Sequence, residues 1–185
     1  MVSGGASAPG ELELVRAFVN TLDVESGEDE LLGPGALASW LADRGLLVQG
    51  TVARRSDLRQ ALAVREALRS LLVANNGGPF DSDAAPVLEA AARAAKLELR
   101  FGPDGAAALE AAASGVPGAL GRLLAVVSGS MAAGTWSRLK ACRAETCHWA
   151  FYDQARNRSR TWCDMAVCGN RVKARTYRKR RRAGP

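Results

Sequence analysis

Several kinds of residue and segment are scarce in this chain of 185 residues, and each scarcity excludes a class of protein. Histidine occurs once, as His148, and aromatic residues make up only 5% of the chain. A single histidine limits acid–base catalysis, and the sequence contains no evident nucleophile–base pair or glycine-rich phosphate loop. No apolar run approaches the roughly 18 residues of a membrane span. We therefore expect a cytoplasmic protein that is not an enzyme and does not bind a membrane.

The positive charge is concentrated at one end of the chain. The net charge is +6, but residues 142–185 contain twelve Lys or Arg and three acids, a balance of +9 that leaves −3 for residues 1–141. All four cysteines also lie in the basic part. This division predicts two parts with different tasks in one chain.

The pattern of apolar residues predicts a mostly helical domain over residues 11–135, after a disordered leader over residues 1–10. Helices are predicted over about 12–22, 34–45, 56–76, 86–95 and 117–134, from apolar residues at three- and four-residue spacing and from capping residues. Leu97, Leu99 and Phe101 alternate with charged residues, which predicts a half-buried strand. The turn sequence Gly-Pro-Asp-Gly at 102–105 predicts that the chain returns as a second strand. The expected fold class is therefore mainly α with a small β-hairpin.

Three polar residues of this domain have two interpretations. Arg65 falls on the apolar face of its predicted helix, where a guanidinium needs a partner. It is either a snorkelling or ion-paired side chain, or an anion-binding residue in a ligand pocket. Asn20 and Thr21 follow an apolar helical stretch and either satisfy backbone groups at a helix end or join that pocket. In the second case the domain would sense a small-molecule effector.

The cysteines form two closely spaced pairs, Cys142-x4-Cys147 and Cys163-x4-Cys168, separated by fifteen residues. Thiolates are the preferred donors of structural zinc, and two such pairs can hold one ion tetrahedrally. We therefore expect one structural Zn²⁺ per chain. Two disulfides would need an oxidising compartment, of which the sequence gives no sign, and unligated cysteines would not explain the pairing. A redox-sensitive site, and His148 as an exchangeable ligand, stay open as alternatives.

The segment between the cysteine pairs is aromatic and then basic. Residues 148–152 are predicted to form a strand whose rings cover the metal site, with base stacking as the alternative. Arg156, Arg158 and Arg160 alternate, so an extended return strand would point all three to one side.

The segment after the last cysteine is strongly basic and contains no acid. If it is helical, its like charges repel one another, and binding to phosphates would relieve the repulsion. Arginine can also read guanine, and asparagine adenine. The candidate nucleic-acid contacts are Arg156, Arg158, Arg160, Asn170, Arg171, Lys173, Arg175, Arg178, Lys179 and Arg182.

The residues around the cysteines resemble a known family. The matching segments are 134–142, Trp-Ala-Phe-Tyr-Asp at 149–153, Trp-Cys at 162–163 and Cys-Gly-Asn-Arg at 168–171. They closely resemble the CGNR zinc-finger family, which is named after the last of these motifs. The preceding domain is similar to the ABATE domain, the usual N-terminal partner of that finger, in residues 18–21, 29–31, 37–41 and 102–105. The resemblance implies a bacterial transcription regulator associated with stress, with the four cysteines as zinc ligands.

These observations together predict a helical domain followed by a small, treble-clef-like zinc module with four cysteine ligands over residues 136–185, which ends in a basic C-terminal helix. The leading interpretation is a zinc-dependent DNA-binding regulator whose N-terminal domain senses a ligand or mediates homodimerisation. If it binds DNA, we expect it to be nucleoid-associated. An RNA-binding or ribosome-associated protein is one alternative, and an adaptor for an acidic protein is another.

Overall fold

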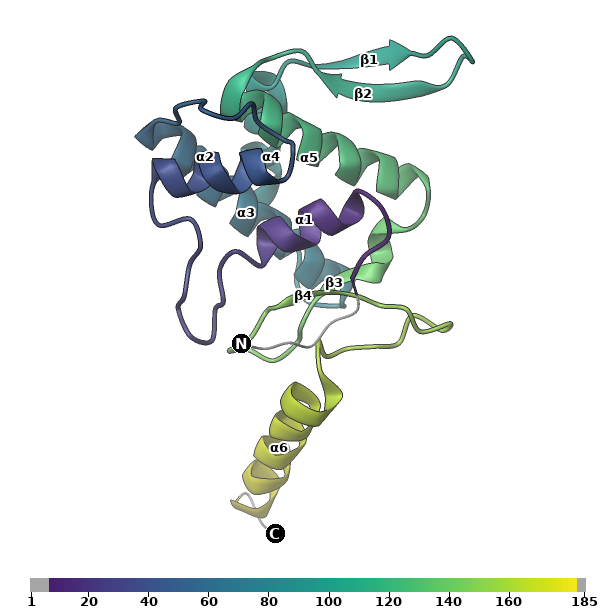
Figure 1. Cartoon of the computed structure of the whole chain (residues 1–185). Helices are drawn as coiled ribbons and strands as arrows, with labels where there is room; N and C mark the ends of the chain where they lie inside the picture. The colour runs from purple at the N-terminus through teal and green to yellow at the C-terminus, as the bar shows by residue number, and fades with distance from the viewer. Residues whose placement is uncertain (1–6, 183–185) are drawn as a thin grey trace.

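Six α-helices and two small antiparallel sheets make up residues 7–182, which are the residues that the computed structural model describes; the side chains of Arg180 and Arg182 are outside that description. The elements are α1 (Leu12–Val19), α2 (Pro34–Asp43), α3 (Arg55–Asn75), α4 (Ala84–Ala94), β1 (Leu97–Phe101), β2 (Ala107–Ala111), α5 (Gly115–Ala132), a 3₁₀ turn (Trp136–Arg138), β3 (Leu139–Ala141), β4 (Ala150–Tyr152), a π-helical turn (Met165–Gly169) and α6 (Asn170–Arg182). The predicted class, mainly α with a β-hairpin and a C-terminal cysteine module, is confirmed (Figure 1).

The centre of the N-terminal domain is α5, which contacts α1, α3, α4 and β2. It is long and apolar enough to cross a membrane by length and composition alone. Its apolar character is explained by its place in the core, where Leu120 and Leu123 are completely buried. Gly121 lets neighbouring segments approach the α5 backbone closely. A Cβ at this position would lie 2.4 Å from Ala95 Cβ and 2.9 Å from Ala111 Cβ. The hairpin and the end of α4 can therefore pack directly on the α5 backbone.

Several helix boundaries differ from the prediction by one to three residues, including the starts of α4 and α5. The first helix ends at Val19, and Leu22 instead forms an isolated bridge with Asp29. The long helix α3 begins at Arg55, and Asp57 Oδ2 accepts a hydrogen bond from the backbone N–H of Arg54 at 2.7 Å. Asp57 thus closes the first turn as expected of a carboxylate at that position.

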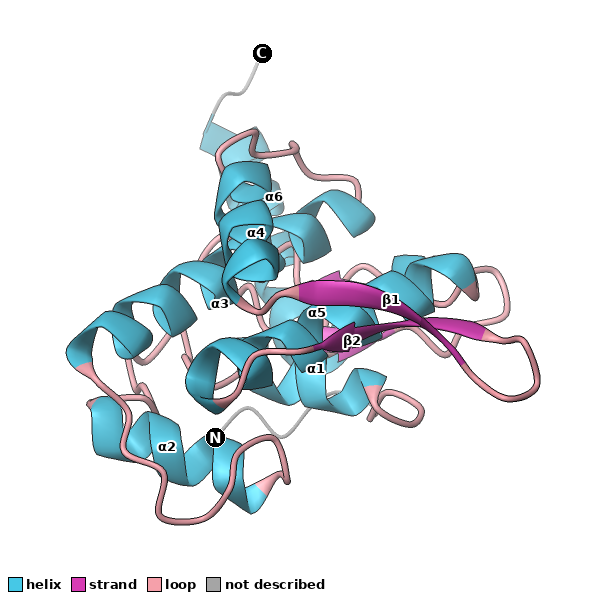
Figure 2. Cartoon of the chain, turned by 90° about the horizontal axis from the view of Figure 1, so that it is seen from above, coloured by secondary structure: helices cyan, strands magenta, loops and turns pink. Residues whose placement is uncertain are grey.

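The hairpin β1–β2 pairs Leu97 with Ala111, Leu99 with Leu109 and Phe101 with Ala107. The strands form as predicted, but the expectation of a half-buried strand holds only at its base. Leu97 packs against the core, whereas Leu99 is 58% exposed and Phe101 is 70% exposed. The reason is tertiary, because the distal half of the hairpin extends beyond the helices (Figure 2).

A shared hydrophobic core joins the zinc module to the N-terminal domain. Trp136, Leu139, Ala150 and Tyr152 belong to the same buried cluster as the helices. At the other end of the chain, residues 1–6 of the expected leader lie outside the described residues. Ala8 is buried, and its N–H donates to Glu13 Oε2 at 2.7 Å, so packing begins before residue 11.

Candidate metal centre and basic helix

Four cysteine sulfurs converge between the β3–β4 hairpin and the start of α6. Cys142 directly follows β3, and its N–H donates to Trp149 O at 3.0 Å, while Cys147 lies in the loop that leads to β4. Cys163 lies just before the π-helical turn that precedes α6, and Cys168 lies within it. All four sulfurs lie within 4.8 Å of one another, and all four residues are buried.

This donor set forms a site for one structural zinc ion. Its composition is that of a closed site with four cysteine ligands, in which thiolates fill all tetrahedral positions and none is left for a catalytic water. Cys163 Sγ lies 3.7 Å from Cys147 Sγ and 3.6 Å from Cys168 Sγ, so the sulfurs surround a common point. The arrangement of two pairs, one beside a hairpin and one at a helix start, is the predicted treble-clef-like form.

The acidity of the thiols shows why the cluster needs a cation. Hydrogen bonds from Cys147 and Cys163 lower the pKa of the Cys142 thiol to about 2. In contrast, contact with Cys142 raises the pKa of Cys147 to about 12, and burial raises the pKa of Cys168. Without a cation the cluster therefore favours one thiolate and resists the next. A divalent ion supplies the positive charge that lets all four sulfurs deprotonate.

Aromatic rings cover the cysteines, as expected. Phe151 is completely buried in the cysteine cluster, and Trp149 and Trp162 pack against it. The guanidinium of Arg160 lies 5.4 Å from the centre of the Phe151 ring and donates to the carbonyl oxygens of Trp162, at 3.0 Å, and Cys163. Arg160 therefore stabilises the backbone around the zinc ligand Cys163.

The predicted return strand with three outward arginines is wrong. Within the described residues, β4 ends at Tyr152 and no strand follows it before α6. Arg158 has a φ of +53°, a left-handed conformation that breaks the alternation on which the prediction rested. Arg156 and Arg158 are exposed, but Arg160 is turned inward, so the three side chains do not share one face.

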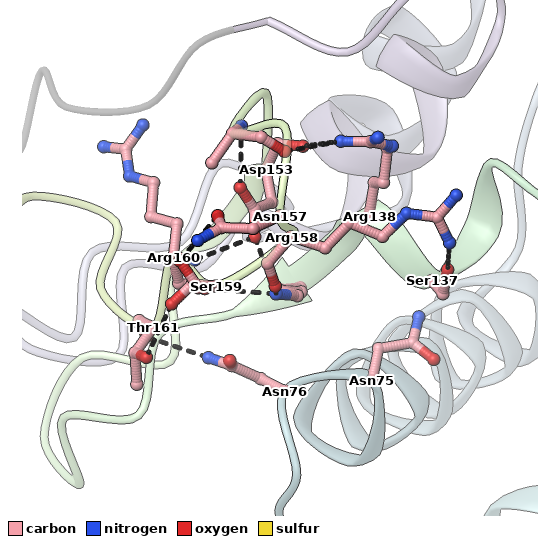
Figure 3. Close-up of polar contacts among 12 residues, drawn as sticks. Asn75, Asn76, Ser137, Arg138, Asp153, Asn157, Arg158, Ser159, Arg160 and Thr161 are labelled. Atoms are coloured by element: carbon pink, nitrogen blue, oxygen red, sulfur yellow. Dashed lines mark hydrogen bonds and ion pairs between the residues drawn. The ribbon is translucent and has the colours of Figure 1, made fainter.

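A buried ion pair holds the loop that connects the cysteine pairs. Lys140 Nζ donates to Asp153 Oδ2 at 2.7 Å and to the carbonyl oxygens of Arg158 and Arg160 at 2.6 and 3.2 Å. Asp153 also accepts from the N–H groups of Ala155 and Arg160, and it has no exposed surface (Figure 3). Burial by itself would raise the pKa of Asp153, but Lys140 and the backbone donors hold it below its ordinary value.

Asparagine side chains clamp the zinc module to the helices. Asn20 forms two hydrogen bonds with the backbone of Ala150, donating at 2.9 Å and accepting at 2.8 Å. Asn75 donates to the carbonyls of Trp136 and Leu139 at 3.0 and 2.9 Å, and Asn76 to those of Ala141 and Thr161 at 2.7 and 2.8 Å (Figure 3).

The three residues suggested for a ligand pocket are engaged with protein groups. Arg65 is 3% exposed and forms a double hydrogen bond with Asp29, at 2.8 and 2.9 Å, which is the ion-pair interpretation. It also donates to the hydroxyl of Thr21 at 3.1 Å, and that hydroxyl donates to Phe18 O at 2.8 Å. Asn20 forms the two hydrogen bonds with Ala150 that are described above. None of the three lines the cavity between the hairpin, α1 and α5, or the smaller cavity beside α2.

The basic helix α6 leaves the metal centre and extends away from the helical domain (Figure 1). Its start is stabilised by Asp164, whose Oδ1 accepts from Val167 N–H at 3.0 Å. Two of its arginines have acidic partners: Arg171 pairs with Glu25, and Arg175 pairs with Glu145 at 2.9 Å. Asn170, Lys173, Arg178 and Lys179 are exposed, whereas the side chain of Arg182 lies outside the described residues.

Apart from Asn20, reasoning from the sequence missed the residues that join the two parts. Asn75 and Asn76 suggested only a helix end, and Arg69, which donates to Val19 O at 2.7 Å and His148 O at 3.2 Å, carried no signal. Lys140 could have been noticed, because it stands between Leu139 and Ala141 in a short apolar strand.

Comparison with known families finds matches to both parts. The CGNR zinc-finger model matches residues 138–181, which include all four cysteines. The ABATE model, described as "Putative stress-induced transcription regulator", matches residues 12–136. No curated protein matches the chain. The family matches agree with the resemblance seen in the cysteine spacing and the residues around it.

Proposed function

The chain belongs to the ABATE family and ends in a CGNR zinc finger, and from this premise we propose that it is a regulator that binds DNA through α6. The families are regulatory rather than enzymatic. In the proposal, zinc builds the base of α6, the asparagine clamps hold that base on the helical domain, and α6 contacts the phosphate backbone.

The observation that carries the proposal is the exposed basic surface of α6. Eight of its 13 residues are Lys or Arg, and none is acidic. It extends from the metal centre instead of packing on the domain (Figure 1). A dense positive charge of this kind destabilises an isolated helix, and a polyanion neutralises it with release of counterions. Contact with phosphates should therefore stabilise α6 more than contact with solvent does.

The zinc has a structural part in this proposal. Cys168 lies two residues before Asn170, where α6 starts, so the metal fixes the point and direction from which the helix leaves. Loss of zinc would leave the basic segment attached but unoriented, with weaker binding and less discrimination between sequences.

Titration of labelled duplex DNA and structured RNA with the zinc-loaded protein, at equal salt, tests the proposal. The double variant Arg178→Ala/Lys179→Ala should weaken binding and reduce the slope of log K against log salt by about 0.9 for each phosphate that is no longer neutralised. Arg93→Ala is the matched control, since Arg93 is 71% exposed on α4 and outside α6. An equal decrease in affinity for both variants, or tighter binding to RNA than to DNA, would contradict the proposal.

Selection from sheared genomic DNA at about 150 mM salt then tests whether binding is sequence-specific, because this salt suppresses purely electrostatic association. We expect a recurrent motif among the retained fragments. Retention without enrichment would mean that the protein is not a sequence-specific regulator.

A further inference from the structure

The β1–β2 hairpin carries an unusual pairing surface on its outer strand. β2 lies against α5, while β1 contacts little besides β2. From Glu98 to Phe101 every residue of β1 is exposed, and the hairpin extends past the helices (Figure 2). The outer edge of β1 has no pairing partner among the described residues. Exposed strand edges of this kind promote pairing with another chain unless they are blocked by proline, bulges or unpaired charge.

The hydrogen-bond pattern shows which backbone groups face that edge. The N–H of Gly102 donates to Ala106 O at 2.8 Å, and the N–H of Ala112 donates to Lys96 O at 3.2 Å. Hydrogen-bonded and non-hydrogen-bonded pairs alternate along an antiparallel ladder. The even-numbered residues of β1 therefore direct their N–H and C=O groups toward β2. Those of Leu97, Leu99 and Phe101 point to the outer edge.

The side chains of β1 are complementary to a second copy of themselves. The strand reads Leu97-Glu98-Leu99-Arg100-Phe101, with apolar residues on one face and opposite charges on the other. If two copies of β1 pair antiparallel about Leu99, each Glu98 lies opposite an Arg100 and each Leu97 opposite a Phe101. Leu99 then lies opposite Leu99 of the second copy. Because the N–H and C=O of Leu99 point to the outer edge, the two residues form a hydrogen-bonded pair.

We propose that β1 is a homodimerisation strand that joins two copies of this chain into a continuous four-stranded sheet in the order β2-β1-β1-β2. The interface is isologous, because the same residues contribute from both sides. β2 could not supply an equivalent pairing. About Leu109 it would place each Glu110 opposite an Ala108, with no charge complementarity.

The proposed symmetry also determines how the two α6 helices are oriented relative to each other. The two-fold axis of such a strand pair runs perpendicular to the sheet, so both bodies lie on the apolar face of the shared sheet. In each copy α6 extends from the side of the body opposite the hairpin (Figure 1). Both basic helices would then point in the same general direction. The dimer itself does not depend on nucleic-acid binding and can be tested without it.

Sedimentation equilibrium of the zinc-loaded full chain, from micromolar to about 200 µM, tests the proposal. The wild type should reach twice the 19.5 kDa mass of the chain. Glu98→Arg and Arg100→Glu should each weaken the dimer at least ten-fold, because each brings like charges together across the two-fold axis. The double variant Glu98→Arg/Arg100→Glu restores opposite charges and should dimerise as the wild type does. An equimolar mixture of the two single variants should also dimerise, as a mixed pair.

Glu89→Arg is the matched control, since it makes the same charge change at an exposed position on α4, outside the hairpin. It should leave the dimer intact. The Glu98–Arg100 ion pair within one chain is exposed, so breaking it is not expected to unfold the hairpin. A wild type that stays monomeric up to about 200 µM, or a dimer that survives both single reversals, would overturn the proposal.

Discussion

Asn20 at the end of α1 and Ala150 in β4 exchange two hydrogen bonds, although 130 residues separate them in the chain. The carboxamide has an NH2 donor group and an oxygen acceptor, which match the C=O and N–H of Ala150. Because Ala150 lies between the cysteine pairs, this contact ties the orientation of the zinc module to the first helix.

Substitution of Asn20 by Ala should lower the free energy of unfolding by about 1–3 kcal/mol, because it leaves two buried backbone groups of Ala150 unsatisfied. Urea denaturation of the zinc-loaded protein would measure this. Asn157→Ala is the control, since Asn157 is exposed and its side chain accepts a hydrogen bond from the exposed Ser159, so the change should alter stability by less than about 0.5 kcal/mol. Equal effects in the two variants would show that the clamp contributes nothing.

Replacement of Cys168 by Ser should reduce bound zinc well below one ion per chain, because it removes one of the four ligands. The melting temperature of the whole chain should fall as well, since the module shares its core with the helices. Metal analysis and calorimetry on the same sample give both quantities. A chain that loses zinc yet melts at the wild-type temperature would contradict the shared-core interpretation.

The Lys140–Asp153 pair should be among the most sensitive sites in the zinc module. Asp153→Asn leaves the Lys140 ammonium buried without its counter-charge and should destabilise the protein by about 3–5 kcal/mol. Glu89→Gln is an informative comparison, because its pair with Arg93 is 3.6 Å long and about two-thirds exposed. That change should be almost neutral. Denaturant midpoints of the two variants, measured side by side, provide the test, and similar midpoints would show that the buried pair is not needed.

The Asp29–Arg65 pair predicts a specific pH dependence. Burial favours a raised pKa for Asp29, but hydrogen bonds from Arg65 and Leu31 lower it below its ordinary value. A carboxyl with a lowered pKa in the folded state stabilises that state above its unfolded pKa of about 3.9 and loses this contribution as pH falls through the folded value. The stability difference between wild type and Asp29→Asn should therefore be about 1–3 kcal/mol at pH 7 and shrink below about pH 4.

Acid also weakens zinc binding, but this effect is common to both proteins and cancels in their difference. Unfolding free energies of both proteins, measured at matched zinc concentration from about pH 7 to about pH 3, provide the test. A difference that stays constant over this range would show that the carboxylate charge of Asp29 does not contribute.

Much of the architecture could be predicted from local patterns. Helices such as α2 and α5 were recognisable because apolar residues repeat at helical spacing, and Pro34 and Gly134 mark their ends. The zinc site was recognisable because ligand type and short spacing are themselves local. The outcome differed where long-range packing intervened. Arg160 belonged to a regular alternation in the sequence, yet in the fold it donates to the backbone beside Cys163 and stabilises the metal site.

The sequence by itself determined that the chain has a helical domain, a four-cysteine site for zinc and a basic C-terminal helix, because periodicity, ligand spacing and charge are properties of neighbouring residues. Only the tertiary structure decided what Asn20, Arg65 and Asn76 do. Their partners lie 36 to 130 residues away in the chain. A polar side chain next to an apolar stretch is compatible with a cap, a ligand contact or a clamp. The choice depends on which backbone or charge the fold brings within hydrogen-bonding distance.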